Sequence, residues 1–119
     1  MPHPFVHVEL QTSDVGKAQT FYRELFKWDF EKVAGMDYTM IKVGSGTGGG
    51  MMKNPVPGAP SHWLAYVGVD DVAGAVKKAK SLGAKVLMDV TDVGGHGLMA
   101  VFTDPTGAPL ALWQEVKKK

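Results

Sequence analysis

The sequence has no cysteine and very little arginine. Its 119 residues contain no cysteine and one arginine, Arg23. The first absence excludes disulfides, thiolate metal sites and cysteine nucleophiles, so any metal would have to be held by His, Asp or Glu. The second leaves almost no side chain for bidentate phosphate or carboxylate recognition, which disfavours phosphate-rich ligands.

Long apolar runs and an excess of one charge are also missing. No apolar stretch approaches the roughly 20 residues that span a bilayer, and residues 1–10 lack the pattern of a signal peptide. We therefore expect a cytoplasmic protein with no membrane partner. The formal net charge is only +1, and it depends on the lysines at 117–119, so we expect no nucleic-acid partner either. The length and the 45% hydrophobic content predict one domain over residues 1–119.

The first half of the chain predicts one helix among four strands. Residues 5–10 alternate, with Phe5, His7 and Glu9 on one face, as in a half-buried strand. Asp14 is placed to cap a helix whose apolar residues recur every three or four positions. Strands at 28–33, 38–43 and around 51–52 follow. The predicted order is β-α-β-β-β.

The second half repeats this order after a proline-rich connector at 54–61. A strand at 62–69 leads to Asp71, a second helix cap 57 residues after Asp14, and Gly83 follows the helix that runs to Leu82. Three more strands complete this half, at 84–90, 98–103 and 108–115.

The repeat predicts an α+β fold of two βαβββ modules, at 5–53 and 62–115. One such module leaves a sheet face exposed, so two must pair, within the chain or across a dimer. We expect their mixed sheets to curve around a central cavity. Behind the sheets we expect an apolar core that includes Phe21, Tyr22, Leu25, Phe26, Val76, Ala79 and Leu82.

Several motifs resemble a known superfamily over residues 7–114. The segment HVEL at 7–10 with DV at 14–15 resembles the opening module of the vicinal oxygen chelate superfamily, which includes glyoxalase I, bleomycin-resistance proteins and extradiol dioxygenases. The segment DPTGA at 104–108 with ALWQ at 111–114 resembles its last hairpin. The resemblance implies paired βαβββ modules around a cavity and a homodimer.

The resemblance also allows the superfamily's metal site to be checked. Metal-using members hold a divalent ion with four protein ligands. His7 falls at the first position, but Leu64 and Ala111 fall at two others, and neither can bind a metal. No His, Asp or Glu occurs between Met40 and Pro60, where the fourth would lie. We therefore predict no cofactor, with an atypical divalent-metal site that includes His7 as the alternative.

Strand alternation and the 57-residue repeat together predict the lining of the cavity. We expect His7, Glu9 and Tyr66 as acid-base candidates. The candidate ligand-binding residues are Phe5, His62, Leu64, Ala111, Trp113 and His96. Plain structural roles remain open for each: His7 as a strand histidine bonded to a neighbour, Glu9 as a solvated carboxylate, Tyr66 and Trp113 as core, and His96 as part of a surface hairpin.

Two functions of different class follow from this lining. The first is a protein that binds a small, largely apolar or aromatic molecule in the cavity without a metal, comparable in role to bleomycin-resistance proteins. The second is an enzyme of the same fold, an isomerase, lyase, cyclase or dioxygenase, that uses His7 for proton transfer or within an atypical metal site.

Overall fold

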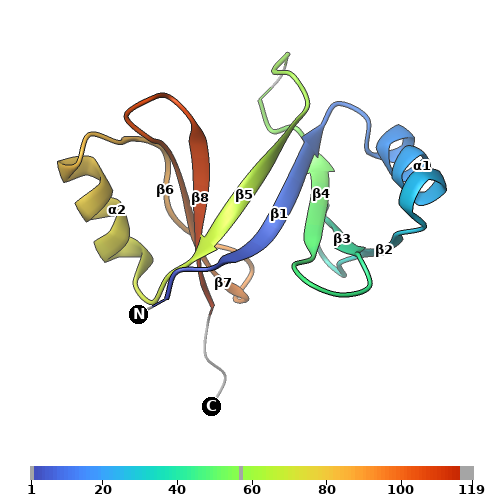
Figure 1. Ribbon diagram of the computed structural model, residues 1–119, viewed down its shortest axis with the longest axis horizontal. Helices are drawn as coiled ribbons and strands as arrows, with labels where there is room; N and C mark the ends of the chain where they lie inside the picture. The colour runs from blue at the N-terminus through green and yellow to red at the C-terminus, as the bar shows by residue number, and fades with distance from the viewer. Residues whose placement is uncertain (1, 57, 116–119) are drawn as a thin grey trace. The chain divides into compact units, whose positions relative to one another are not determined.

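A computed structural model describes residues 2–56 and 58–115, and this part of the chain forms an α+β fold (Figure 1). Its elements are, in chain order, β1 (Phe5–Thr12), α1 (Val15–Phe26), β2 (Asp29–Lys32), β3 (Thr39–Lys42), β4 (Gly49–Lys53), β5 (His62–Gly68), α2 (Val72–Ser81), β6 (Lys85–Asp92), β7 (Gly97–Thr103) and β8 (Pro109–Glu115). In these residues, neither helix is long and apolar enough to cross a membrane.

The chain divides into two compact units. The N-terminal unit is His7–Leu64, and the C-terminal unit joins the residues up to Val6 to the chain from Ala65 onward. The strand order is β2-β3-β4-β1 in the first and β5-β8-β7-β6 in the second. In each unit the first strand pairs in parallel with the last, β1 with β4 and β5 with β8, and the other pairs are antiparallel.

Residues 2–6 are tied to the end of β5 within the C-terminal unit. The backbone N–H of Gly68 donates to the carbonyl of Pro4 at 2.9 Å. A Cβ on Gly68 would lie 2.9 Å from the Val6 side chain, so a glycine there lets the two segments approach closely. This unit is therefore completed by residues that are distant in sequence.

The two helices begin in the same way, as the repeat predicts. Asp14 and Asp71 precede α1 and α2 with φ/ψ of −145°/94° and −144°/94°. Each carboxylate accepts a backbone N–H in the first turn, from Lys17 at 3.0 Å and from Gly74 at 3.1 Å. Gly83 follows α2 with a φ of 102°, the left-handed conformation that favours glycine after a helix.

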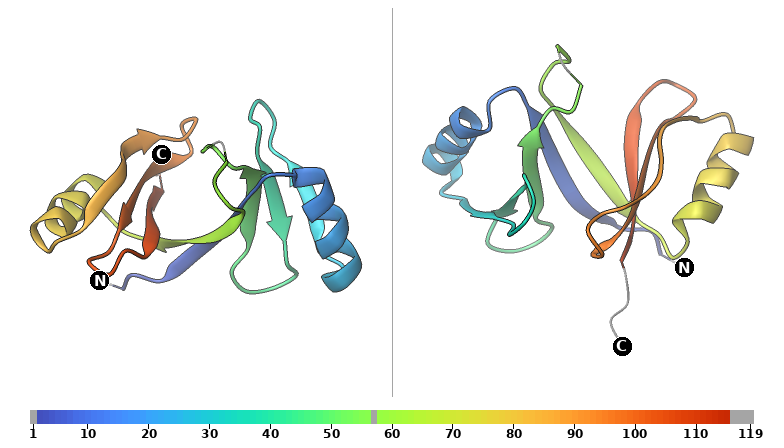
Figure 2. Two further views of the ribbon diagram at one scale, coloured as in Figure 1. Left: turned by 90° about the horizontal axis from the view of Figure 1, so that it is seen from above. Right: turned by 180° about the vertical axis from the view of Figure 1, so that it is seen from behind.

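Each helix covers one face of its own unit's sheet (Figure 2). In the N-terminal unit, Leu10, Ile41 and Met51 are buried against α1. In the C-terminal unit the buried cluster is Val72, Val76, Ala100 and Leu112. Side chains alternate along a strand, and the Leu10 side chain points toward α1. His7, Glu9 and Gln11 therefore lie on the opposite face of the sheet.

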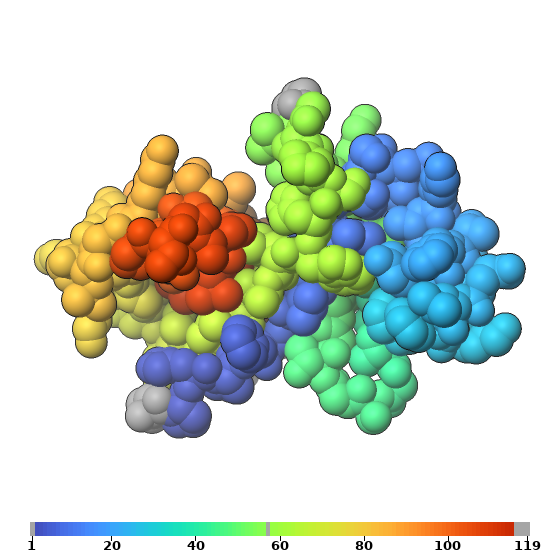
Figure 3. Space-filling model, turned by 45° about the horizontal axis from the view of Figure 1, so that its top comes forward, coloured from blue at the N-terminus to red at the C-terminus, as the bar shows by residue number. Residues whose placement is uncertain are grey.

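Four residues that were expected in the core are exposed, which corrects that prediction. The exposed fractions are 57% for Phe21, 56% for Leu25, 52% for Phe26 and 68% for Leu82. Val15, Ala18 and Tyr22 occupy the face of α1 that meets the sheet, and Phe21 and Leu25 lie about 100° and about 60° around the helix axis from Tyr22, toward solvent. Atoms of α1, in light blue, stand at the surface in Figure 3.

Rings gather around Tyr22 at the edge of this exposed region. Its ring lies 5.0 Å from Phe21, 6.3 Å from Phe26, 5.6 Å from Trp28 and 5.6 Å from Trp63, between centroids. Trp63 is itself 40% exposed. We call Phe21, Leu25, Phe26 and Trp63 the α1 apolar surface.

The difference in burial predicts unequal costs for two apolar truncations. Met51 is fully buried, so Met51→Ala should lower the free energy of unfolding by about 2 to 5 kcal/mol. Leu82→Ala, at a side chain that is 68% exposed at the end of α2, should cost less than about 1 kcal/mol. Urea denaturation measures both. Equal losses would contradict the difference in burial between Met51 and Leu82.

Candidate functional site

Four polar side chains form a hydrogen-bonded network on the face of the N-terminal sheet opposite α1. His7 Nε2 lies 2.7 Å from the Tyr38 hydroxyl. That hydroxyl donates to Glu9 Oε1 at 2.9 Å, and Gln11 Nε2 donates to Glu9 Oε2 at 2.7 Å. The phenol of Tyr38 therefore joins His7 to Glu9, and we call this the His7–Tyr38–Glu9 network.

The local sequence explains how these side chains meet. His7, Glu9 and Gln11 share one face of β1 by alternation. Tyr38 ends the hairpin loop before β3, where its carbonyl accepts the Val33 N–H at 2.9 Å. Its ring reaches β1 across β4 at Gly50, which is paired with Glu9 in the strand register; a Cβ there would overlap the ring and hydroxyl of Tyr38.

Burial controls the electrostatics of the network. Glu9 is only 3% exposed, and a carboxylate is stable in such a place only if its oxygens are hydrogen-bonded, as both are here. His7 is half-buried, and this desolvation lowers its pKa while the nearby charge of Glu9 acts to raise it. The net shift is downward, so the imidazole is neutral at neutral pH.

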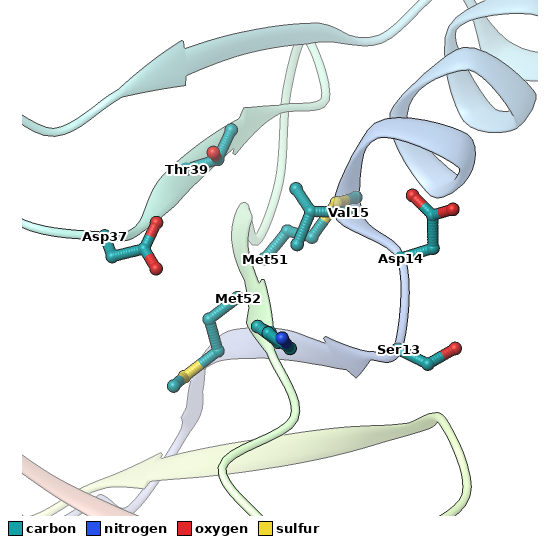
Figure 4. Close-up of a pocket in the computed structure, with 8 residues that line it drawn as sticks. Ser13, Asp14, Val15, Asp37, Thr39, Met51 and Met52 are labelled. Atoms are coloured by element: carbon teal, nitrogen blue, oxygen red, sulfur yellow. The ribbon is translucent and has the colours of Figure 1, made fainter.

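Thioether side chains flank the network on the same face. Gly50 is paired with Met40 on β3, and Met52 is paired with Gln11 on β1, so both methionines share a face with Glu9. Met40 is 36% exposed. In Figure 4, Met52 extends away from Met51 and Val15, which lie together on the α1 side. The face thus combines flexible apolar surface with a fixed polar centre.

A shallow cavity of about 310 Å³ adjoins this region in the N-terminal unit (Figure 4). It is lined by Ser13, Asp14, Val15, Asp37, Thr39, Met51, Met52 and Lys53. Met52 connects it to the network face, and Asp37 precedes Tyr38 in the chain. Asp14 is already committed to capping α1, so its carboxylate serves the fold.

Three of the predicted site residues lie on β5 and β8 of the C-terminal unit. Tyr66 is 4% exposed, and its hydroxyl lies 4.0 Å from the Met99 sulfur. Ala111 is fully buried and is paired with Tyr66 in the β5–β8 register. Trp113 is half-buried, with its ring where a side chain on Gly97 would lie.

The remaining predicted residues lie in separate settings. Phe5 is 64% exposed near the start of β1, and Leu64 is buried. His62 Nδ1 lies 3.0 Å from the Pro60 carbonyl oxygen. His96 is exposed in the turn between β6 and β7, where its backbone N–H donates to the Val93 carbonyl. Among the acid-base candidates, the structure joins His7 and Glu9 through Tyr38.

The donor set does not fit a four-ligand metal centre. Within residues 2–56 and 58–115, no group of three or more His, Cys, Asp or Glu side chains is placed to hold an ion. Leu64 and Ala111 are buried and carry no donor atom. His7 Nε2 and Glu9 are both hydrogen-bonded to a tyrosine hydroxyl.

Sequence reasoning missed Tyr38, Gln11 and Gly50. Gln11 was within reach, because alternation along β1 places it beside Glu9. Tyr38 is separated from His7 by 31 positions, and only the strand order brings the two together. Gly50 lies within β4 and carries no side chain that could mark it as part of a site.

Known proteins of similar sequence support one family. The chain is 37% identical over 115 residues to the Mycobacterium tuberculosis protein CFP32, whose name calls it a glyoxylase, with 90% of this chain and 44% of that protein covered. It is 40% identical over 62 residues to the anthracycline biosynthesis protein DnrV of Streptomyces peucetius, covering 52% of this chain and 22% of that protein. The chain thus spans less than half the length of these relatives.

Solved structures show the same fold. A Bacillus halodurans protein matches with a TM-score of 0.71 at 11% identity, covering 100% of this chain and 99% of that one. Methylmalonyl-CoA epimerase from Mycobacterium tuberculosis matches with a TM-score of 0.68 at 13% identity, covering 95% and 88%. The profile of one family covers residues 5–112. The chain belongs to the glyoxalase/bleomycin resistance protein/dioxygenase superfamily.

Proposed function

We propose that this domain binds a small, largely apolar or aromatic molecule on the network face of its N-terminal unit, without a metal. The observation that carries the proposal is the His7–Tyr38–Glu9 network set between Met40 and Met52. Small-molecule sites commonly combine apolar contact area with a few fixed polar groups that orient the ligand. Methionines supply adaptable contact area for a flat ligand.

The charge state of the network favours a neutral, mainly apolar ligand. His7 is uncharged at neutral pH, and the carboxylate of Glu9 is buried and hydrogen-bonded by Tyr38 and Gln11. Lys42 on the same face of β3 is paired with Glu31 at 2.9 Å. The similarity to an anthracycline biosynthesis protein supports polycyclic aromatic compounds as the first probes.

An enzyme that moves a proton with His7 is the second candidate. A neutral imidazole hydrogen-bonded to a tyrosine is equipped for acid-base work, as in an isomerase, lyase or cyclase. The variant His7→Ala distinguishes a binding protein from an enzyme. If His7→Ala abolished the turnover of a substrate whose affinity it left unchanged, the domain would be an enzyme.

We also propose that two copies of the domain associate through the α1 apolar surface. Phe21, Leu25 and Phe26 are each more than half exposed on one 12-residue helix, which has no buried residue. Together with Trp63 they expose on the order of 400 Å² of apolar area per chain, within the range of the largest apolar patch on a monomer, which is often an interaction site. Two such surfaces related by a twofold axis would cover each other.

Ligand binding is testable with an uncharged anthracycline aglycone, whose fluorescence reports binding, and with 1-naphthol as a smaller probe. We expect saturable binding that EDTA does not change. His7→Gln should weaken it about tenfold through the loss of an orienting contact, while His3→Gln, at an exposed histidine, should leave it unchanged. Absence of saturable binding for both probes would remove the support for a binder, and loss of binding in EDTA would restore a metal site.

The lowered pKa of His7 predicts a pH dependence of stability. Folding favours the neutral imidazole, so this contribution is fully present above the ordinary histidine pKa of about 6.5. It is lost as the pH falls through that value and then through the lower folded-state pKa. Urea denaturation at pH 7.5 and at pH 5 should show a smaller decrease for His7→Gln than for the wild type. Identical decreases would contradict the shift.

Self-association is testable by light scattering over a range of micromolar concentrations. We expect a dimer for the wild type and a monomer for Leu25→Glu, because a buried unpaired charge opposes the contact. Lys80→Glu, on the exposed face of α2, is the control and should remain dimeric. A wild-type monomer at every concentration would overturn the proposed pairing.

A further inference from the structure

The Tyr38 side chain occupies space that a strand residue would normally fill. Its ring and hydroxyl lie where the Cβ of any residue other than glycine at position 50 would be. Gly50 is paired with Glu9 on one side and with Met40 on the other, so the ring crosses β4 at the level of Glu9. The hydroxyl thereby reaches both His7 and Glu9.

Space, rather than backbone conformation, is the reason for glycine here. The glycines with positive φ include Gly44 and Gly46 of the preceding loop, but Gly50 has an ordinary strand conformation that any residue adopts. A side chain at this position would meet no conformational strain. It would displace Tyr38.

Counting protons in the network assigns the tautomer of His7. A tyrosine hydroxyl carries one proton, and Tyr38 donates it to Glu9 Oε1. Gln11 donates to the other oxygen, as befits an ionised carboxylate that only accepts. The Tyr38 oxygen can then only accept from His7, so the proton of the imidazole lies on Nε2, 2.7 Å away.

We propose that Gly50 is a positioning residue that, by admitting the Tyr38 ring over β4, fixes His7 in the Nε2–H tautomer. Because Gly50 has no side chain, the Tyr38 hydroxyl can lie between His7 and Glu9. The hydroxyl donates its proton to Glu9, so its oxygen must accept a hydrogen bond from His7. The imidazole proton therefore lies on Nε2. Nδ1 is then the acceptor nitrogen of the ring. The assignment holds whether the site binds a ligand or catalyses a reaction.

Two substitutions test separately the space at Gly50 and the hydroxyl of Tyr38. Gly50→Ala adds the Cβ that overlaps the ring, so Tyr38 must leave its place. Tyr38→Phe keeps the ring and removes the hydroxyl that joins His7 to Glu9. Gly16→Ala is the matched control, because its Cβ would make only an ordinary contact, 3.7 Å from Asp14 Oδ1.

The test is a long-range ¹H–¹⁵N NMR spectrum of the histidine rings in ¹⁵N-labelled protein at pH 8, where His7 is neutral. The His7 signals are assigned by their loss in His7→Gln. We expect the Nε2–H pattern in the wild type and in Gly16→Ala. Gly50→Ala and Tyr38→Phe should both move the ring nitrogens toward the averaged shifts of two exchanging tautomers.

Two results would overturn the proposal. One is an Nδ1–H or averaged pattern in the wild type, and the other is an unchanged pattern in Gly50→Ala. If Gly50→Ala alone fails to fold, it is compared in the Tyr38→Ala background, where the overlap is gone. Recovered folding there supports the steric part, and continued failure overturns it. The spectrum needs no ligand, so its outcome is independent of the ligand-binding titration.

Discussion

Burial of the Glu9 carboxylate is the constraint on which the N-terminal unit depends. An ionised group in the interior of a sheet is costly unless its oxygens receive hydrogen bonds. Gln11 supplies one from the same strand, and Tyr38 supplies the other from a loop 29 positions away. Three features position the Tyr38 phenol beside Glu9 or contact it there. They are the hairpin before β3, the glycine at position 50 in β4, and His7.

The repeat relates the two units while their chemistry differs. The offset of 57 that matches the helix caps also matches Glu9 with Tyr66, and both side chains are buried. One is an ionised acceptor within a polar network, and the other is a phenol whose hydroxyl lies beside a methionine sulfur. The shared backbone pattern thus carries a buried carboxylate in one unit and a buried phenol in the other.

Local patterns were sufficient for the fold and insufficient for the site. The helix caps at Asp14 and Asp71 and the order of elements follow from short-range rules of capping and periodicity. His7 and Glu9 were found because they alternate on one strand. Tyr38 was not found, because its partners are determined by strand order. The exposure of Phe21 and Leu25 was also missed. The spacing of apolar residues predicts which face of a helix is apolar, but it does not predict how much of that face the sheet covers.

The tie between Gly68 and Pro4 has a consequence for the order in which the units form. During synthesis His7–Leu64 leaves the ribosome as a continuous stretch, so that unit can begin to fold early. Residues 2–6 emerge before it, yet their partners at the end of β5 and beyond emerge after it. The C-terminal unit therefore assembles only after residues 2–6 and the chain from Ala65 onward have both emerged, and the Pro4–Gly68 hydrogen bond closes a long loop in the sequence.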